Sequence, residues 1–251
     1  MLKVIKNRDK KMKDKLRSEL IVALDFSSQK EALSLINQLE GLPVTYKIGS
    51  ELFLAAGPSF VESLVHQGEN IFLDLKFYDI PNTVLQAAKR AAQLGVKMFT
   101  VHLSGGQKML ESLTQEFSDL VEKPKVLGVS VLTSFDEQSW ADWLQLNGSI
   151  KGVSVLSSVS GLVKAGVDCG IDGVVCSAFE LETLKKLFPD LYTVVPGIRL
   201  NHGNNADQSR VMTPAQASGK GASAIVVGRP ITQSETPRAV VENIIKELSF
   251  S

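Results

Sequence analysis

The sequence contains few cysteines and no long apolar run, and both absences exclude classes of protein. Its two cysteines, Cys169 and Cys176, are seven positions apart and form no CxxC or Cys/His pattern. This argues against a disulfide framework and a zinc site, and it fits a reducing cytoplasm. No apolar stretch approaches the length of a membrane span, and the first residues lack the pattern of a secretory signal. We therefore expect a cytoplasmic protein that has no membrane partner.

Net charge is also absent, although the charges are unevenly distributed. The chain has 27 Lys or Arg and 27 Asp or Glu, of which residues 1–17 contain eight basic and two acidic ones. The remainder has 19 basic and 25 acidic residues, a balance that makes a poor general surface for nucleic acid. We interpret residues 1–18 as a basic N-terminal extension, more typical of a solvated tail than of a nucleic-acid-binding arm.

The pattern that is present is an alternation of short β-branched segments with longer segments of helical spacing. The predicted strands are 19–26, 44–49, 71–77, 98–103, 125–132, 173–177, 192–198 and 224–229. The predicted helices include 29–39, 60–66, 83–94, 107–117, 181–188 and 237–248, with two further helical pieces within 136–166. Ser28, Pro81 and Gly95 stand where a helix cap, a first helical turn and a helix end need them.

Eight such alternations predict a closed parallel (β/α)8 barrel, a TIM barrel, with a doubly wound open sheet as the alternative. A length of 251 residues is normal for one such barrel, and 44% hydrophobic residues suffice for a sizeable core. No Pro/Ser-rich linker and no change of composition follows residue 18. We therefore predict one catalytic domain over residues 19–251.

Polar side chains recur where the predicted strands end. They are Asp25, Lys47, Asp74, Lys76, His102, Thr133, Arg199 and Arg229. Because TIM barrels place their chemistry at the carboxyl ends of the strands, these residues predict a polar pocket there. We expect a structural hydrogen-bonding role for His102. No group of His, Asp and Glu has metal-ligand spacing, so we expect no metal.

The densest group of polar residues runs from Asp74 to Thr83. Strand alternation puts Asp74 and Lys76 on one face, whereas Asp79 lies beyond the strand end and its direction is not fixed. Two carboxylates beside one lysine favour its charged ammonium, which suits a proton donor better than a free-amine nucleophile. The alternative is a buried ion-pair cluster that merely fixes a loop.

A second group, of glycines and arginines, ends the seventh and eighth predicted strands. Its members are Gly197, Arg199, Gly228 and Arg229. Glycine lets backbone N–H groups approach an anion and arginine adds a bidentate cation, at the strand ends where these barrels bind phosphate. The polar loop of residues 200–212 between the two strands is typical of a lid or of a disordered insertion.

Together these segments resemble orotidine 5'-phosphate decarboxylase over residues 19–248. The most specific match is Asp74-Leu75-Lys76-Phe77-x-Asp79-Ile80-Pro81-Asn82-Thr83. Others are Val22-Ala23-Leu24-Asp25, Tyr46-Lys47-Ile48-Gly49, Val101-His102 with Gly105-Gly106, Val131-Leu132-Thr133-Ser134, Pro196-Gly197-Ile198-Arg199, Asp207-Gln208-x-Arg210 and Val227-Gly228-Arg229-Pro230. The sequence departs from the family at Tyr78, where many bacterial members have histidine, and in its basic start.

The resemblance implies a cofactor-free decarboxylation of orotidine 5'-phosphate (OMP) to UMP and CO2 in pyrimidine biosynthesis. It implies a homodimer with shared active sites, into which the partner subunit's Asp79 and the partner subunit's Thr83 enter. The implied catalytic residues are Lys76, Asp74 and Asp79. The implied substrate-binding residues are Asp25, Lys47 and Thr83 for the ribose, Thr133 for the pyrimidine, and Arg199, Gln208, Gly228 and Arg229 for the phosphate.

Two other functions fit part of the pattern. A Mg²⁺-dependent sugar-phosphate decarboxylase or hexulose-phosphate synthase also has an Asp-x-Lys-x-x-Asp motif on its third strand, but Thr133, Gln208 and the long seventh loop argue against it. A non-catalytic barrel that binds a nucleotide phosphate would use the two arginines equally well, although it has no need of Asp74, Lys76 and Asp79.

Overall fold

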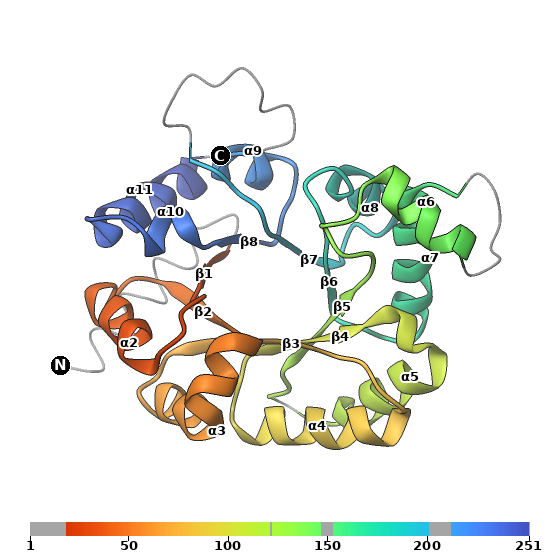
Figure 1. Ribbon diagram of the computed structural model, residues 1–251, viewed down its shortest axis with the longest axis horizontal. Helices are drawn as coiled ribbons and strands as arrows, with labels where there is room; N and C mark the ends of the chain where they lie inside the picture. Colours follow the sequence, from red (N-terminus) through yellow and green to blue (C-terminus); the bar gives the residue numbers. More distant parts are fainter. Residues whose placement is uncertain (1–18, 121, 147–152, 201–211, 251) are drawn as a thin grey trace.

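Eight parallel strands close into a barrel that a ring of helices surrounds (Figure 1). The computed structural model describes residues 19–120, 122–146, 153–200 and 212–250. The strands are β1 (Glu19–Ala23), β2 (Val44–Gly49), β3 (Asn70–Phe77), β4 (Met98–His102), β5 (Lys125–Val129), β6 (Gly173–Val175), β7 (Tyr192–Val195) and β8 (Ala224–Val227). They pair in sequence order, and β8 returns to β1 through Glu19↔Ala224 to Val22↔Val227. The predicted (β/α)8 barrel is confirmed, and the open sheet is excluded.

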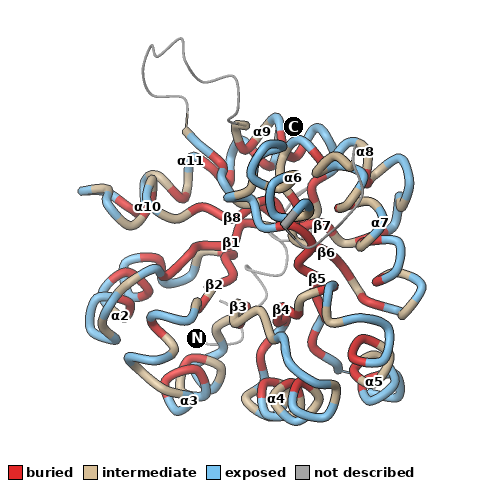
Figure 2. The backbone as a smooth tube through the Cα atoms, turned by 45° about the vertical axis from the view of Figure 1, so that its right-hand side comes forward, coloured by how far each residue is buried: buried red, intermediate tan, exposed pale blue. Residues whose placement is uncertain are grey.

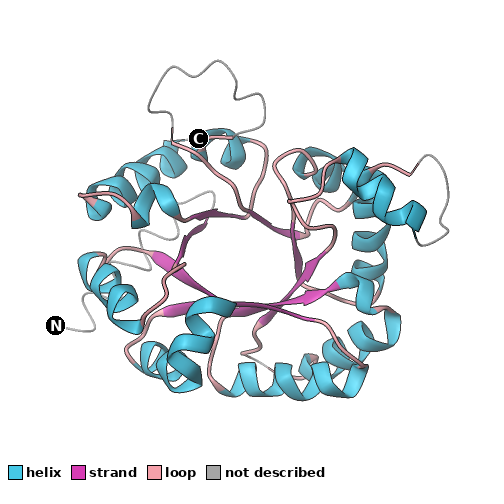
Figure 3. Ribbon diagram, in the orientation of Figure 1, coloured by secondary structure: helices cyan, strands magenta, loops and turns pink. Residues whose placement is uncertain are grey.

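The helices form the outer layer of the molecule (Figure 3). They are α2 (Gln29–Gln38), α3 (Ser50–His66), α4 (Pro81–Gln93), α5 (Gln107–Phe117), α6 (Glu137–Leu146), α7 (Val155–Asp168), α8 (Leu181–Leu187), α9 (Pro214–Gly219), α10 (Arg229–Thr232) and α11 (Pro237–Phe250), with a 3-10 turn η1 (Leu103–Gly105). Ser28 caps α2 by accepting a hydrogen bond from the Glu31 backbone N–H, and Pro81 opens α4, as predicted. Among the described residues, no helix is both long and apolar enough to cross a membrane.

Two kinds of boundary differ from the sequence prediction. Helix α3 begins at Ser50 instead of residue 60. It consists of two helical pieces separated by a kink at Gly57, whose φ of +74 is not helical and which Pro58 follows, and the sequence prediction covered only the second piece. The strands end earlier than predicted, β1 at Ala23 instead of residue 26 and β8 at Val227 instead of residue 229. The apolar pattern misleads there because residues beyond the last pair, such as Leu24, are still buried. Residues 1–18, interpreted as a basic extension, lie outside the described residues.

The core has two shells, because successive strand residues point to opposite sides of the sheet. The larger shell lies between the barrel and the buried faces of the helices (Figure 2). The smaller one fills the barrel with Ile21, Ala23, Phe72, Met98, Leu127, Val194, Ala224 and Val226. Interior packing of this kind makes a plugged barrel rather than a pore, so ligands are confined to its ends. Replacing Phe72, which is 1% exposed, by Ala would cost about 3–5 kcal/mol of stability.

The amino end of the barrel is closed by a polar network around Glu19. Its carboxylate accepts hydrogen bonds from Thr45 Oγ1 and from the Tyr192 hydroxyl, the latter at 2.8 Å, and so joins β1, β2 and β7. Burial, and then the Glu19 carboxylate, raise the pKa of Tyr192 well above its usual range, so the phenol remains a donor. Lys125 Nζ lies 5.2 Å from the centre of the Tyr192 ring. This end of the barrel is stabilised by internal contacts, whereas the residues that the sequence predicts to be functional lie at the opposite end.

Candidate active site

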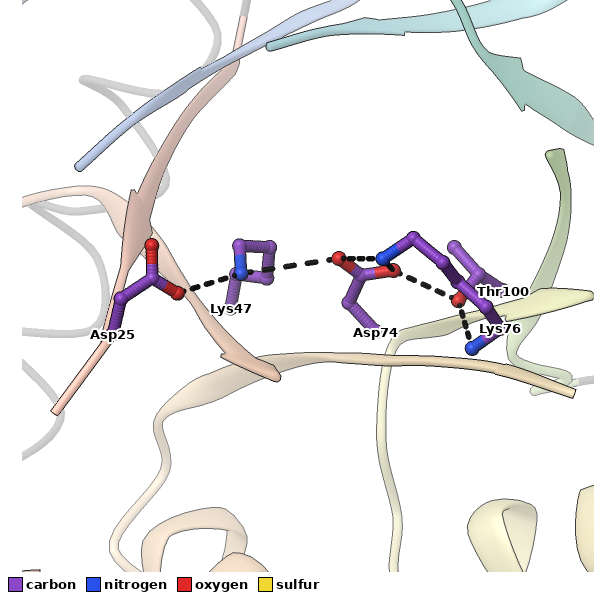
Figure 4. Close-up of polar contacts among 5 residues, drawn as sticks. All are labelled: Asp25, Lys47, Asp74, Lys76 and Thr100. Carbon is purple, nitrogen blue, oxygen red and sulfur yellow. Dashed lines mark hydrogen bonds and ion pairs between the residues drawn. The ribbon is translucent and has the colours of Figure 1, made fainter. Parts of the chain in front are cut away.

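Four charged side chains of alternating sign form a row at the carboxyl end of β1, β2 and β3 (Figure 4). Lys47 Nζ lies 3.0 Å from Asp25 Oδ1 and 3.8 Å from Asp74 Oδ2. Lys76 Nζ lies 2.9 Å from each of the two Asp74 oxygens. The structure thus brings together three of the predicted polar strand ends in one continuous array.

The array is buried in its middle and open at its ends. The side chains of Lys47 and Asp74 are 13% and 14% exposed, whereas those of Asp25 and Lys76 are 62% and 39% exposed. Each buried charge is therefore compensated by neighbours of opposite sign, as a charge removed from water requires. The Lys76 ammonium keeps one side open to a ligand, while Asp74 holds the other.

Lys76 reaches Asp74 through a distortion of β3 and not through simple alternation. Lys76 has φ +51, and it is the only residue other than glycine with positive φ among the described residues. The pairing of β3 with β4 runs from Leu73↔Phe99 directly to Phe77↔Val101, so the chain bulges between them. The predicted meeting of Asp74 and Lys76 is confirmed, but the physical reason is a bulge that turns the lysine back, a device common beside active sites.

Asp79 and Thr83 are not part of this array within the chain. Asp79 is exposed, and its Oδ1 accepts a hydrogen bond from the backbone N–H of Ile80 at 2.6 Å. Among the described residues, Asp79 makes no ion pair with Lys76. Thr83 is exposed on the first turn of α4. Both side chains are therefore accessible to a second molecule.

Arg199 and Arg229 line one cavity of about 390 Å³ together with Leu200, Pro230, Gln233, Ser234 and Val240. Both arginines are exposed, and neither forms an ion pair with a carboxylate in the part of the chain that the structure describes. Gly228 precedes Arg229, and a Cβ added to this glycine would lie 3.6 Å from Asp25 Oδ2. The arginine site therefore adjoins the charged array. Gln208, the remaining residue predicted for this group, lies outside the described residues.

Thr133 lines a larger cavity, of about 650 Å³, between the ends of β5, β6 and β7. Its other walls include Ser177, Glu180, Pro196 and Gly197. Glu180 is 7% exposed, and its carboxylate accepts a hydrogen bond from the Ser177 backbone N–H at 2.7 Å. Gly197 has φ +79, a conformation that favours glycine. The cavity has room for a ring-sized ligand.

His102, at the end of β4, packs against Tyr78 with ring centres 5.3 Å apart and planes tilted by 45°. Burial, and then the Lys76 ammonium, lower the pKa of His102, while Asp74 acts in the opposite direction. Among the described residues, the His102 imidazole has this ring contact and no hydrogen-bond partner, so the hydrogen-bonding role expected for it stays a prediction.

Thr100 belongs to the array although no motif marks it. Its side chain is fully buried in β4, and its hydroxyl lies 2.9 Å from Asp74 Oδ1 and 2.8 Å from the backbone nitrogen of Lys76. The available signal was a polar residue inside the apolar predicted strand 98–103.

In the described ranges, no group of three or more His, Cys, Asp or Glu could hold a metal ion.

The fold and the site define a (β/α)8-barrel enzyme whose charged array and paired arginines lie at the carboxyl ends of the strands. The chain belongs to the orotidine 5'-phosphate decarboxylase / HUMPS family, whose sequence model matches residues 18–244.

Individual relatives agree with this membership. The chain is 44% identical over 230 residues to orotidine 5'-phosphate decarboxylase of Neisseria meningitidis serogroup C (strain 053442), and the match covers 91% of each chain. It is 44% identical over 234 residues to orotidine 5'-phosphate decarboxylase of Legionella pneumophila (strain Corby), and the match covers 92% of this chain and 99% of the relative. The crystal structure of orotidine 5'-phosphate decarboxylase from Lactobacillus acidophilus superimposes with a TM-score of 0.80 at 37% identity. The superposition covers 92% of this chain and 99% of the Lactobacillus chain.

Proposed function

We propose that the chain is a decarboxylase that converts OMP to UMP and CO2 in pyrimidine biosynthesis, with no metal or organic cofactor. The observation that carries this proposal is the alternating Asp25–Lys47–Asp74–Lys76 array at the mouth of a barrel of this family. A pure binder of a nucleotide phosphate has no use for a lysine that pairs with a neighbouring carboxylate and has a strained backbone conformation.

The chemistry follows from what one ammonium can do beside the reacting carbon. When the bond from C6 of OMP to its carboxylate breaks, the electron pair stays on C6 and CO2 leaves. The Lys76 ammonium stabilises this developing negative charge and then transfers a proton from Nζ to C6, which gives UMP. Asp74 fixes the ammonium by contacts of 2.9 Å and places a negative charge near the substrate carboxylate, a repulsion that departure of CO2 relieves. Solvent then returns a proton to Lys76.

In this proposal, the remaining side chains each bind a different part of the substrate. Asp25, Lys47 and Thr83 hold the ribose, and Thr133 contacts the pyrimidine. Arg199, Gln208, Gly228 and Arg229 bind the phosphate. Support for the phosphate group comes from the shared cavity of the two unpaired arginines, since a dianion requires compensating cations. Their distance from the reacting carbon lets phosphate binding contribute to catalysis through orientation rather than chemistry.

We propose that the enzyme is a homodimer in which the partner subunit's Asp79 and the partner subunit's Thr83 complete each site. Exposed large apolar side chains support an interface, because Tyr78 and Ile80, which flank Asp79, are 60% and 68% exposed, and Leu54 is 83% exposed. Leu54 lies on α3, and the other two precede α4. A cytoplasmic location is part of the proposal and is supported by the two unpaired cysteines.

The test is an assay of the purified chain with OMP, followed by the fall in absorbance and by chromatographic detection of UMP. We expect stoichiometric UMP, with the same rate before and after dialysis against EDTA. No turnover of OMP by the folded protein would overturn the proposal in favour of a binding barrel. Activity that dialysis removes and Mg²⁺ restores, with a sugar phosphate as the better substrate, would favour the Mg²⁺-dependent relatives.

A further inference from the structure

We propose that Thr100 is a positioning residue for the decarboxylation, in that its hydroxyl sets the geometry of both Asp74 and Lys76. This inference rests on the proposed function of Lys76 as the proton donor. Thr100 is not expected to touch the substrate, since it is 0% exposed and lies beside Asp74 and Lys76 at one end of the array (Figure 4).

The hydroxyl of Thr100 makes two hydrogen bonds of different direction. It lies 2.9 Å from Asp74 Oδ1, to which it donates because a carboxylate only accepts. It accepts from the Lys76 backbone N–H at 2.8 Å. One hydroxyl has a single proton, so the bond to Asp74 fixes the orientation in which its lone pair faces the Lys76 backbone. The side chain of Asp74 and the backbone of Lys76 are thereby coupled through one atom.

The bulge in β3 explains why a side chain is needed at this position. Three residues of β3, from Asp74 to Lys76, stand opposite Thr100 alone, because the pairing passes from Leu73↔Phe99 to Phe77↔Val101. In a regular ladder, backbone carbonyls accept such N–H groups. Here the Thr100 hydroxyl accepts from the Lys76 N–H, and Lys76 holds the left-handed conformation, φ +51, that a long side chain rarely adopts.

The contact has a specific consequence for the proposed reaction. Loss of the hydroxyl leaves the Lys76 N–H without its acceptor and frees one oxygen of Asp74 from a donor, so both the bulge and the carboxylate can shift. The Lys76 ammonium would then move relative to C6, while the arginine cavity stays intact. We therefore expect a loss in kcat with little change in KM, since displacement of a reacting group by about 1 Å can lower a rate about 100-fold.

The experiment compares Thr100→Val, which removes the hydroxyl at constant shape, with Thr100→Ser, which retains it. The matched control is Thr45→Val, because Thr45 is also 0% exposed and also donates to a carboxylate, that of Glu19, but at the opposite end of the barrel. We expect Thr100→Val to lower kcat for OMP about 10- to 100-fold with KM within about threefold. Thr100→Ser and Thr45→Val should retain kcat within about threefold of wild type.

A second measurement does not depend on activity. Amide hydrogen exchange at Lys76 should become faster in Thr100→Val than in wild type or Thr45→Val, because its N–H loses its acceptor. A Thr100→Val protein with wild-type kcat, or with unchanged exchange at Lys76, would overturn the inference. Equal loss of kcat in Thr45→Val would also overturn it, because the effect would then be one of general stability. A wild-type protein that does not turn over OMP contradicts the proposed function instead, and exchange at Lys76 still decides whether Thr100 holds the bulge.

Discussion

Arg199 and Arg229 follow the neighbouring strands β7 and β8, thirty positions apart in the sequence, and they line the same cavity without a carboxylate partner among the described residues. Two cations in one cavity repel each other, and a bound anion removes this repulsion. The cavity is therefore the proposed phosphate site.

Replacing Arg229 by Ala should raise KM for OMP by one to three orders of magnitude, about 1.5–3 kcal/mol or more for a charge-assisted contact. Orotidine, which lacks the phosphate, should be a poor substrate for wild type, and its kcat/KM should change little when Arg229 is replaced. Lys246→Ala, which removes a cation from an exposed position of α11, is the control and should leave KM unchanged. Equal sensitivity of OMP and orotidine to Arg229→Ala would show that this residue does not bind phosphate.

The shared site is tested by mixing two inactive variants, Lys76→Ala and Asp79→Ala. In a mixed dimer, one site receives both defects, whereas the other combines an intact Lys76 with the partner subunit's Asp79. With random exchange about half of the dimers are mixed and half of their sites are intact, so roughly a quarter of wild-type activity should return. A mixture that stays inactive, although a tag pull-down confirms exchange, would place Asp79 in the site of its own subunit.

The polar network at the amino end of the barrel should affect stability without affecting turnover. Tyr192→Phe removes the hydroxyl that donates to Glu19 at 2.8 Å, and we expect the free energy of unfolding to fall by about 1–2 kcal/mol. Urea unfolding measures this loss, and kcat for OMP should stay at the wild-type value because the network lies at the end opposite the array. A large loss of kcat at unchanged stability would contradict the division between a stabilising end and a catalytic end.

His102 should make the stability of the folded chain depend on pH, and the sign of this dependence follows from its lowered pKa. The folded chain disfavours the imidazolium through burial and the Lys76 ammonium, so below the unfolded pKa of about 6.5 the unfolded chain takes up a proton that the folded chain does not. Wild type should therefore lose more stability than His102→Gln when the pH falls from about 8 to about 5.5. Equal losses of urea midpoint in the two proteins would show that His102 does not contribute.

The sequence predicts the barrel well because its signals are local. Period-2 apolar segments and helical segments follow each other in chain order, and parallel strands joined by helices have few ways to close. Lys47 and Asp74 could be placed together for the same reason, since strand ends of one barrel meet at one edge. The family motif places Lys76 beside Asp74 within one short segment.

What the sequence does not predict depends on pairing between distant residues. The bulge at Lys76 exists only through the register of β3 against β4, and Thr100 acquires its role only opposite that bulge. The first half of α3 was missed because Gly57 and Pro58 have the local signature of a break. In the proposed dimer, the position of Asp79 relative to Lys76 depends on a second molecule, so one folded chain does not determine it.

The central claim, that the Lys76 ammonium protonates C6 of OMP, is tested most directly by Lys76→Ala in paired measurements of OMP turnover and UMP affinity. We expect decarboxylation to be nearly abolished while UMP binds with an affinity close to that of wild type, because Lys76 acts on the reacting carbon and adds little to ground-state binding. Normal turnover of OMP by the purified, folded Lys76→Ala protein would contradict the account.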